Sequence, residues 1–415
     1  MRIHSKIAFL LLGSIALFSS AAEAQQVLVV DGSGTGDATS IADAIQIANN
    51  GDLILVESGT YDGFTIQEKS LQVRASPGAD VVVEGRVLLR ELNAQQPVVL
   101  EGLTLNGANL SAFGSEFLRV VAPDAFIWIV DCRFEQLCKP GVTLNPLVEV
   151  NQEGTIPSME QIQGYTAFVR TEGVVQDCTP FLLSAFAPAL NVIDASVHSF
   201  ESTWQGNQAS PALTVTSFGL VGSAWLSNTH LLGGDGFASP QCDLPVNGGP
   251  AANVQGTIFS EEPPRLAWRS STFEPGVGTT DGCGLVGFDP SPIQAGAGAL
   301  LEDLGDGAIS VSGPLQVAPN TPFDWNFSGP SGAVYGLAVS ARPGTTQIAP
   351  AFQPLLLQEP FALRFLGNLD TEGQATRSLI APAPTGPFLS LFTQAFAVES
   401  TGSALLGTPM PILVR

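Results

Sequence analysis

The chain has 415 residues, of which 44 are glycine and 30 are proline, and its formal net charge is −22 at pH 7. This charge excludes nucleic acid as the expected partner, since phosphate binding needs clustered Lys and Arg, and it disfavours a polyuronate substrate, whose negative charge would be repelled. With 45% hydrophobic and 13% charged residues, the composition is typical of a folded, turn-rich β protein rather than of a disordered one.

The first 24 residues have the organisation of a secretory signal peptide. Arg2 and Lys6 form a positive n-region, Ile7–Phe18 is an apolar h-region, and Ala22-Glu23-Ala24 fits the small-x-small cleavage rule. We expect cleavage near Ala24 and a secreted protein, extracellular or on the cell surface. The apolar run is too short for a membrane anchor and no other stretch approaches about 20 apolar residues, so we expect no transmembrane segment.

A short helix is predicted over 41–48. Thr39 and Ser40 are N-cap residue types, and an apolar face recurs at i, i+3, i+4, i+7 through Ile41, Ala44, Ile45 and Ala48. The run Asn49-Asn50-Gly51 ends the helix, because Asn and Gly accept the left-handed conformation at a helix C-terminus. Short strands are expected next, at 53–56, 64–66 and 71–73.

This stretch resembles the N-terminal part of the pectin-lyase-like, right-handed parallel β-helix proteins. The family pattern of a helix followed by G-D-x-I-x-V-x-x-G-x-Y is matched by Ile41, Ala44, Ile45, Ala48, Gly51, Asp52, Ile54, Val56, Gly59 and Tyr61. The resemblance implies a helix that closes one end of a coiled sheet. It does not fix the function, because proteins of this fold include lyases, hydrolases, esterases and adhesins.

An imperfect repeat follows, which reads apolar-x-turn residue-small-x-apolar. The turn residue is one that tolerates left-handed φ or bonds its own backbone, as expected where two short strands meet at a tight corner of a coil. Stacked coils of this kind bury one continuous core. The repeat's turn residues are Gly102, Asp131, Asp194, Asn228, Gly256 and Ser270.

We therefore predict an all-β protein with two domains after the signal peptide at 1–24. Residues 25–290 are expected to form a right-handed parallel β-helix with an N-terminal capping helix, and a β-sandwich is the alternative for this region. Residues 297–415 alternate apolar and polar residues between Gly/Pro/Asn turns, which indicates a small antiparallel β-sandwich. That region loosely resembles the C-terminal β domains of secreted proteins from planctomycete-type bacteria.

Few residues suggest catalysis. Asp131, Asp194 and Asn228 occupy equivalent corner positions and are expected to stack in one column, while Arg133 and His230 lie two residues beyond their corners and are expected to face solvent along one sheet. These five are weak catalytic candidates, because corner residues of this type usually bond backbone. The signatures of the family's lyases, hydrolases and esterases are not found.

Two tryptophans are candidates for ligand binding. The alternation of the repeat places Trp128 and Trp225 outward, where an exposed ring would stack on a sugar. Trp268 is predicted to face the core instead.

Five cysteines in an exported chain permit at most two disulfides. A bridge between Cys242 and Cys283 would join two Gly/Pro-rich loops, Cys132 and Cys138 would close a small loop, and Cys178 would remain buried. No spacing suggests a zinc site, so we expect no metal and no cofactor. A Ca²⁺ site in the Gly-rich run at 31–37 is not supported by EF-hand spacing.

Two functional hypotheses of different class remain open, with a purely structural envelope component as a third. The first is a non-catalytic surface or extracellular protein that binds a polysaccharide or cell-surface glycan through a sheet face. The second is a polysaccharide-active enzyme, a lyase or glycoside hydrolase, with an atypical site on the β-helix face. Converging carboxylates and a base in a groove would favour the enzyme, whereas an exposed aromatic and polar strip would be enough for the binder.

Overall fold

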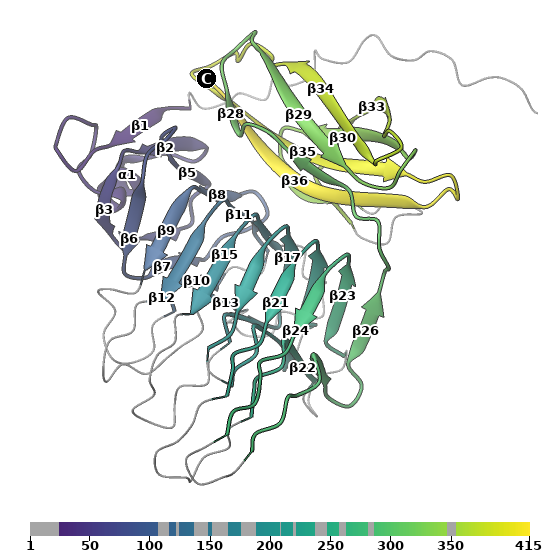
Figure 1. Cartoon of the computed structure of the whole chain (residues 1–415). Helices are drawn as coiled ribbons and strands as arrows, with labels where there is room; N and C mark the ends of the chain where they lie inside the picture. The colour runs from purple at the N-terminus through teal and green to yellow at the C-terminus, as the bar shows by residue number, and fades with distance from the viewer. Residues whose placement is uncertain are drawn as a thin grey trace, which may run out of the picture.

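The structure is a computed structural model that describes residues 25–106, 116–121, 124–136, 148–151, 165–175, 188–207, 209–218, 221–236, 247–256, 263–280, 286–346 and 354–415. They form a parallel β-helix followed by a mainly antiparallel β-sandwich, which confirms the predicted fold class (Figure 1). Within these residues no helix is both long and apolar enough to cross a membrane. The expected signal peptide lies outside them.

The β-helix has three parallel sheets, here named A, B and C in the order in which each coil visits them. Sheet A contains β1 (Val27–Val30), β2 (Asp52–Val56), β5 (Leu71–Ala75), β8 (Val98–Glu101), β11 (Phe126–Val130), β14 (Tyr165–Val169), β17 (Ser196–Phe200), β20 (Ser223–Ser227), β23 (Arg265–Arg269) and β26 (Leu300–Asp303). Sheet B contains β3 (Gly59–Asp62), β6 (Val81–Glu84), β9 (Leu103–Asn106), β12 (Arg133–Gln136), β15 (Glu172–Val175), β18 (Thr203–Gln205), β21 (His230–Leu232) and β24 (Thr272–Glu274). Sheet C contains β4 (Thr65–Gln67), β7 (Val87–Arg90), β10 (Leu118–Val121), β13 (Val148–Asn151), β16 (Leu190–Ile193), β19 (Leu213–Ser217), β22 (Ala252–Gly256) and β25 (Ile293–Ala295).

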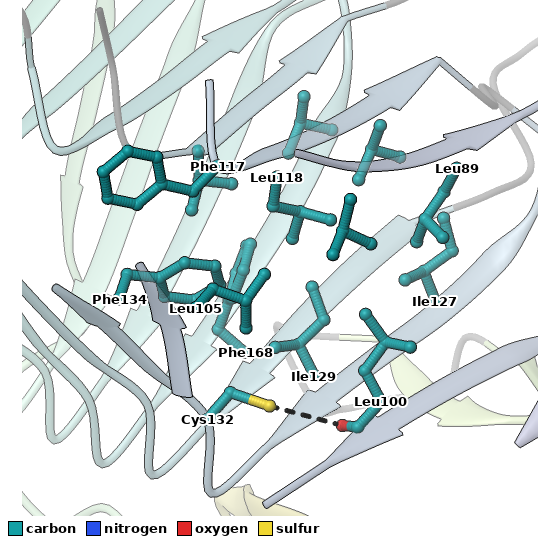
Figure 2. Packing of buried hydrophobic residues seen from close by; sticks show 14 of the residues in the cluster. Leu89, Leu100, Leu105, Phe117, Leu118, Ile127, Ile129, Cys132, Phe134 and Phe168 are labelled. Atoms are coloured by element: carbon teal, nitrogen blue, oxygen red, sulfur yellow. Dashed lines mark hydrogen bonds between the residues drawn. The ribbon is translucent and has the colours of Figure 1, made fainter. Parts of the chain in front are cut away.

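The interior is a stack of apolar side chains from all three sheets. Every second residue of a strand points inward, and in-register neighbours such as Leu100 and Ile129 are fully buried. Figure 2 shows Leu105 and Phe134 of sheet B with Leu118 of sheet C in the same core. Full burial of one such side chain contributes about 1.5–3 kcal/mol, so the stack is the main source of stability.

Helix α1 (Ile41–Ile47) closes the N-terminal end, as predicted. The Ser40 side chain caps its first turn by accepting from the Asp43 backbone N–H at 3.1 Å. Ile41 and Ala44 are buried against the first coil. The Lys69 ammonium donates to carbonyls of the last turn, including Ile45 at 2.7 Å, which satisfies acceptors that a helix end leaves unpaired.

From β8 onward, each corner from sheet A to sheet B contains a single residue with positive φ. Asp131, Arg170 and Glu201 all have φ of 49°, and each backbone N–H donates to a carbonyl on the next coil, as from Asp131 to Val169 at 3.0 Å. The prediction of Gly102, Asp131, Asn228 and Ser270 as corners is confirmed. Arg170 and Glu201 were missed, because their residue types do not favour this conformation.

The β-helix extends to Asp303, beyond the expected boundary at 290. Beyond residue 290 the chain forms β25, which pairs with β22, and then β26, which pairs with β23. The sandwich begins near 308, and its strands are β27 (Ser310–Ser312), β28 (Gln316–Val317), β29 (Pro322–Ser328), β30 (Val334–Ser340), β31 (Pro343–Thr346), β32 (Leu355–Leu357), β33 (Ala362–Asn368), β34 (Gln374–Ile380), β35 (Leu389–Val398) and β36 (Ala404–Val414).

The sandwich lies against the outer face of sheet A and not over the last coil (Figure 1). Its five-stranded sheet, in the order β28-β36-β35-β30-β33, contacts the β-helix through β36, which lies against β14 and β17. From β2 to β17, sheet A is thus covered on both faces, by the core and by the sandwich. The outer faces of sheets B and C lie away from the sandwich, so a solvent-facing site on the β-helix is expected there.

Candidate functional site

Trp128 points outward from sheet A, as its alternation predicts, but the sandwich buries it completely. Its ring packs edge-on against Phe392 of β35, with centroids 5.1 Å apart. Its Nε1 donates to Tyr165 Oη at 2.9 Å, and that hydroxyl donates to the Leu356 carbonyl at 2.9 Å. The expectation that Trp128 stacks on a sugar is therefore wrong, because a segment more than 200 residues away covers it.

Trp225 is also unavailable for stacking on a ligand. It is 8% exposed, with the His198 ring parallel to its own at 6.1 Å and the Arg265 guanidinium 4.6 Å from its ring centroid. His198 is 2% exposed, its Nδ1 has no hydrogen-bond partner, and burial lowers its pKa to about 3. Trp225 is thus part of a buried aromatic row on sheet A and not a binding platform.

The expected column of Asp131, Asp194 and Asn228 is not formed as predicted. Asp131 and Asn228 are corners between sheets A and B, whereas Asp194 lies between β16 of sheet C and β17 of sheet A. Both kinds of corner use one left-handed residue with an apolar residue two positions before it and another three positions after it, so they share the same sequence repeat. The sequence pattern therefore did not distinguish the corner between sheets A and B from the corner between sheets C and A.

The A-to-B corners instead form an ionic row beside the sandwich. The Arg170 guanidinium donates two hydrogen bonds to the Asp131 carboxylate of the preceding coil, from Nε at 2.7 Å and from Nη2 at 2.8 Å. Glu201, on the next coil, accepts from the Thr408 hydroxyl of β36, and burial raises the pKa of this carboxyl. Asp131 is thus bound to a neighbouring coil by a bidentate ion pair.

Arg133 and His230 do face solvent on one sheet, as predicted. They belong to a single row on sheet B in which Arg133, Glu172, Thr203 and His230 are in register on successive strands. The Arg133 Nε lies 2.7 Å from Glu135 Oε1 and 3.4 Å from Glu172 Oε2. His230 Nε2 lies 3.1 Å from Glu274 Oε1. With three strand spacings of about 4.8 Å between them, Arg133 and His230 do not converge on one substrate atom.

Sheet C carries an uncharged, largely polar surface that no local sequence pattern predicts. The outward residues from β16 to β25 are in register and none is ionisable. One is Ile193, and the others carry an amide or a hydroxyl; they are Asn191, Thr214, Thr216, Asn253, Gln255 and Gln294. All are partly or fully exposed. Amides and hydroxyls both donate and accept hydrogen bonds, so this row, here named the amide–hydroxyl row, suits a neutral ligand rich in hydroxyl groups.

An exposed aromatic residue stands at the edge of this row. Phe218 directly follows β19, the strand that carries Thr214 and Thr216, and it is 51% exposed. Its backbone N–H donates to the Asp194 carboxylate at 2.7 Å. Asp194 therefore acts as a corner residue that fixes the backbone of Phe218 on the next coil. The available sequence signal was the alternate spacing of Thr214, Thr216 and Phe218, which places the three side chains on one face of the strand.

The expected disulfides are largely outside the described residues, since Cys138, Cys178, Cys242 and Cys283 are not described. Cys132 is a free thiol, buried in the core, whose Sγ donates to the Leu100 carbonyl at 3.7 Å (Figure 2). This corrects the expected Cys132–Cys138 bridge, because Cys132 occupies the inward position after a corner. In the described part of the chain, no three His, Cys, Asp or Glu residues lie together as metal ligands would.

The Cys132 thiol is expected to be unreactive in the folded protein. Burial raises its pKa to about 12, and the thiolate is the nucleophilic form. Incubation with iodoacetamide at pH 8, followed by peptide mass spectrometry, should leave Cys132 unmodified in the native protein and modify it in guanidinium chloride. Rapid modification without denaturant would contradict this assignment.

Comparisons with known proteins assign no family. No family model matches the chain, and no curated protein matches it. Among solved structures it is similar to a superoxide reductase (neelaredoxin) from Ignicoccus hospitalis, with 14% identity over 26% of this chain and 80% of that chain, at a TM-score of 0.16. A variant of the same enzyme matches at 12% identity, with the same coverage and TM-score. Such low scores carry no argument about fold or function.

Proposed function

We propose that the protein is an exported, non-catalytic β-helix protein that binds a neutral polysaccharide or cell-surface glycan along sheet C. The observation that carries the proposal is the amide–hydroxyl row, an open surface without charge on a chain of net charge −22. Successive strands repeat the row about every 4.8 Å, so the row would meet an extended chain of sugars at several adjacent points.

Phe218 gives this surface an apolar contact. Sugar rings have apolar faces that pack on exposed aromatic rings. Asn253 and Gln255 supply the adjacent hydrogen-bonding groups, and the Gln255 amide already donates to the Asn253 side chain at 3.0 Å. This mutual contact holds both amides in place before a ligand arrives, which lowers the entropy cost of binding.

The test is retention of the protein on immobilised neutral polysaccharides. Phe218→Ala is expected to weaken retention about 10-fold or more, a loss of about 1.4 kcal/mol. Phe365→Ala is the matched control, because Phe365 is another exposed phenylalanine, placed on β33 of the sandwich. Equal retention of both variants and the unaltered protein would reject sheet C as the binding surface.

A second candidate, a polysaccharide-active enzyme, is favoured by the His230–Glu274 contact on sheet B. A carboxylate that orients a histidine is the usual arrangement of a general base. His230→Gln and Glu274→Gln would each abolish any cleavage if this pair were the catalytic base. Unchanged cleavage in both variants would exclude the pair.

A further inference from the structure

The two ends of the β-helix differ in how their cores are covered. At the N-terminal end, α1 lies over the first coil and buries Ile41, Ala44 and Ile45 there. At the other end the chain leaves the last coil at Asp303 and turns to the sandwich beside sheet A. Strands β24, β25 and β26 are each the terminal strand of their sheet, so one edge of each has no strand partner within the described residues.

Inward-facing side chains become exposed at this end. Leu266 of β23 is fully buried, whereas Leu301, its in-register neighbour on β26, is 42% exposed. Ile293 of β25 is likewise only partly buried, although its in-register neighbour Ala252 is fully buried. The hydrophobic core is thus partly exposed to solvent at its last coil. The strand edges there are also uncovered, and an uncovered edge pairs readily with another chain.

The composition of this end indicates what covers it. The segment from 291 to 301 contains no charged residue, although the whole chain has a net charge of −22. Native sheet edges are usually protected by charges, and that protection is missing along β25 and the start of β26. Two copies of so acidic a chain repel each other over most of their surface. They can approach most easily where neither is charged.

We propose that the last coil is a dimerisation surface, on which a second copy of this chain packs end to end about a two-fold axis. Head-to-tail stacking is blocked because α1 covers the opposite end and presents Asp43 and Gln46 to solvent. The contact is therefore isologous, with the same surface used by both copies, and it closes at two chains. It covers Leu301, Ile293, the free edge of β25 and the uncharged start of β26.

The test is the molar mass of the mature protein in solution, measured by light scattering and sedimentation from about 1 to 100 μM, a range that spans micromolar affinity. The expected mass is twice that of the monomer. Leu301→Glu should convert the dimer to a monomer, because it buries a charge in the contact. Leu363→Glu is the matched control, since Leu363 of β33 is 43% exposed and lies on the sandwich.

Ala295→Glu serves as a second variant on β25, where the side chain is exposed and the fold of the monomer should tolerate it. Both variants at the last coil are expected to be monomers with the circular dichroism of the unaltered protein. A monomeric unaltered protein over the whole concentration range would overturn the proposal. So would a dimer that survives Ala295→Glu, or one that Leu363→Glu dissociates.

Discussion

Replacing Trp128 by alanine is expected to lower the free energy of unfolding by about 3–5 kcal/mol, the usual cost of removing a large buried aromatic side chain. Trp128 is fully buried between sheet A and Phe392 of the sandwich. The variant also leaves the Tyr165 hydroxyl without its tryptophan donor. Urea denaturation measures the change, and hydrogen exchange should increase in β36, because the sandwich is held less firmly against sheet A.

Two controls separate this effect from a general sensitivity to mutation. Phe365→Ala removes an aromatic ring that is 61% exposed, so its effect should stay within about 0.5–1 kcal/mol. Tyr165→Phe removes only the hydroxyl that joins Trp128 to Leu356, which should cost about 1–3 kcal/mol. A loss below about 1 kcal/mol for Trp128→Ala would contradict the buried interface.

The second large effect is a loss of stability in acid that depends on His198. The folded protein holds this imidazole neutral, with a pKa lowered to about 3 from a usual value of 6.5. Between these two values the unfolded chain binds a proton that the folded protein does not, so stability falls as the pH decreases from 6.5 towards 3. At pH 5 the loss is about 2 kcal/mol, because one pH unit corresponds to about 1.4 kcal/mol.

His198→Phe keeps a ring beside Trp225 and removes the titrating nitrogen. The stability of this variant relative to the unaltered protein should therefore improve by about 2 kcal/mol between pH 7 and pH 5. Glu201 acts in the opposite direction, since its raised pKa favours folding at lower pH, but its contribution is common to both proteins and cancels. Parallel pH profiles for His198→Phe and the unaltered protein would reject the assignment.

Local sequence rules predicted the elements of this fold but not the surface that each element would meet. Ser40, Ile41 and Ala44 define α1 through capping and periodicity alone, whereas Gly51, expected to end the helix, lies three residues beyond its extended C-cap Ala48. The alternation that turns Trp128 outward is equally local, and it was correct. The covering of that face by Phe392 depends on how two domains pack, and no local pattern encodes this packing.

In the candidate site, too, features set by local sequence were predicted, and features set by the alignment of distant strands were not. The positions of Arg133 and His230 on one exposed row follow from their distance to a corner, and they were predicted correctly. The mistake over Asp194 arose because two kinds of corner share one pattern. The amide–hydroxyl row becomes visible only when the strands are in register, since Asn191, Thr214 and Asn253 lie 23 and then 39 residues apart in the sequence.

The measurement that tests the central proposal most directly is incubation of the mature protein with a panel of neutral and acidic polysaccharides, with and without Ca²⁺. Retention of the protein, new reducing ends and absorbance of unsaturated products are followed together. We predict retention on a neutral polysaccharide, reduced in Phe218→Ala and unchanged in Phe365→Ala, without new reducing ends. Cleavage of any polysaccharide would contradict a non-catalytic role, and absence of retention on every neutral polymer would contradict glycan binding by sheet C.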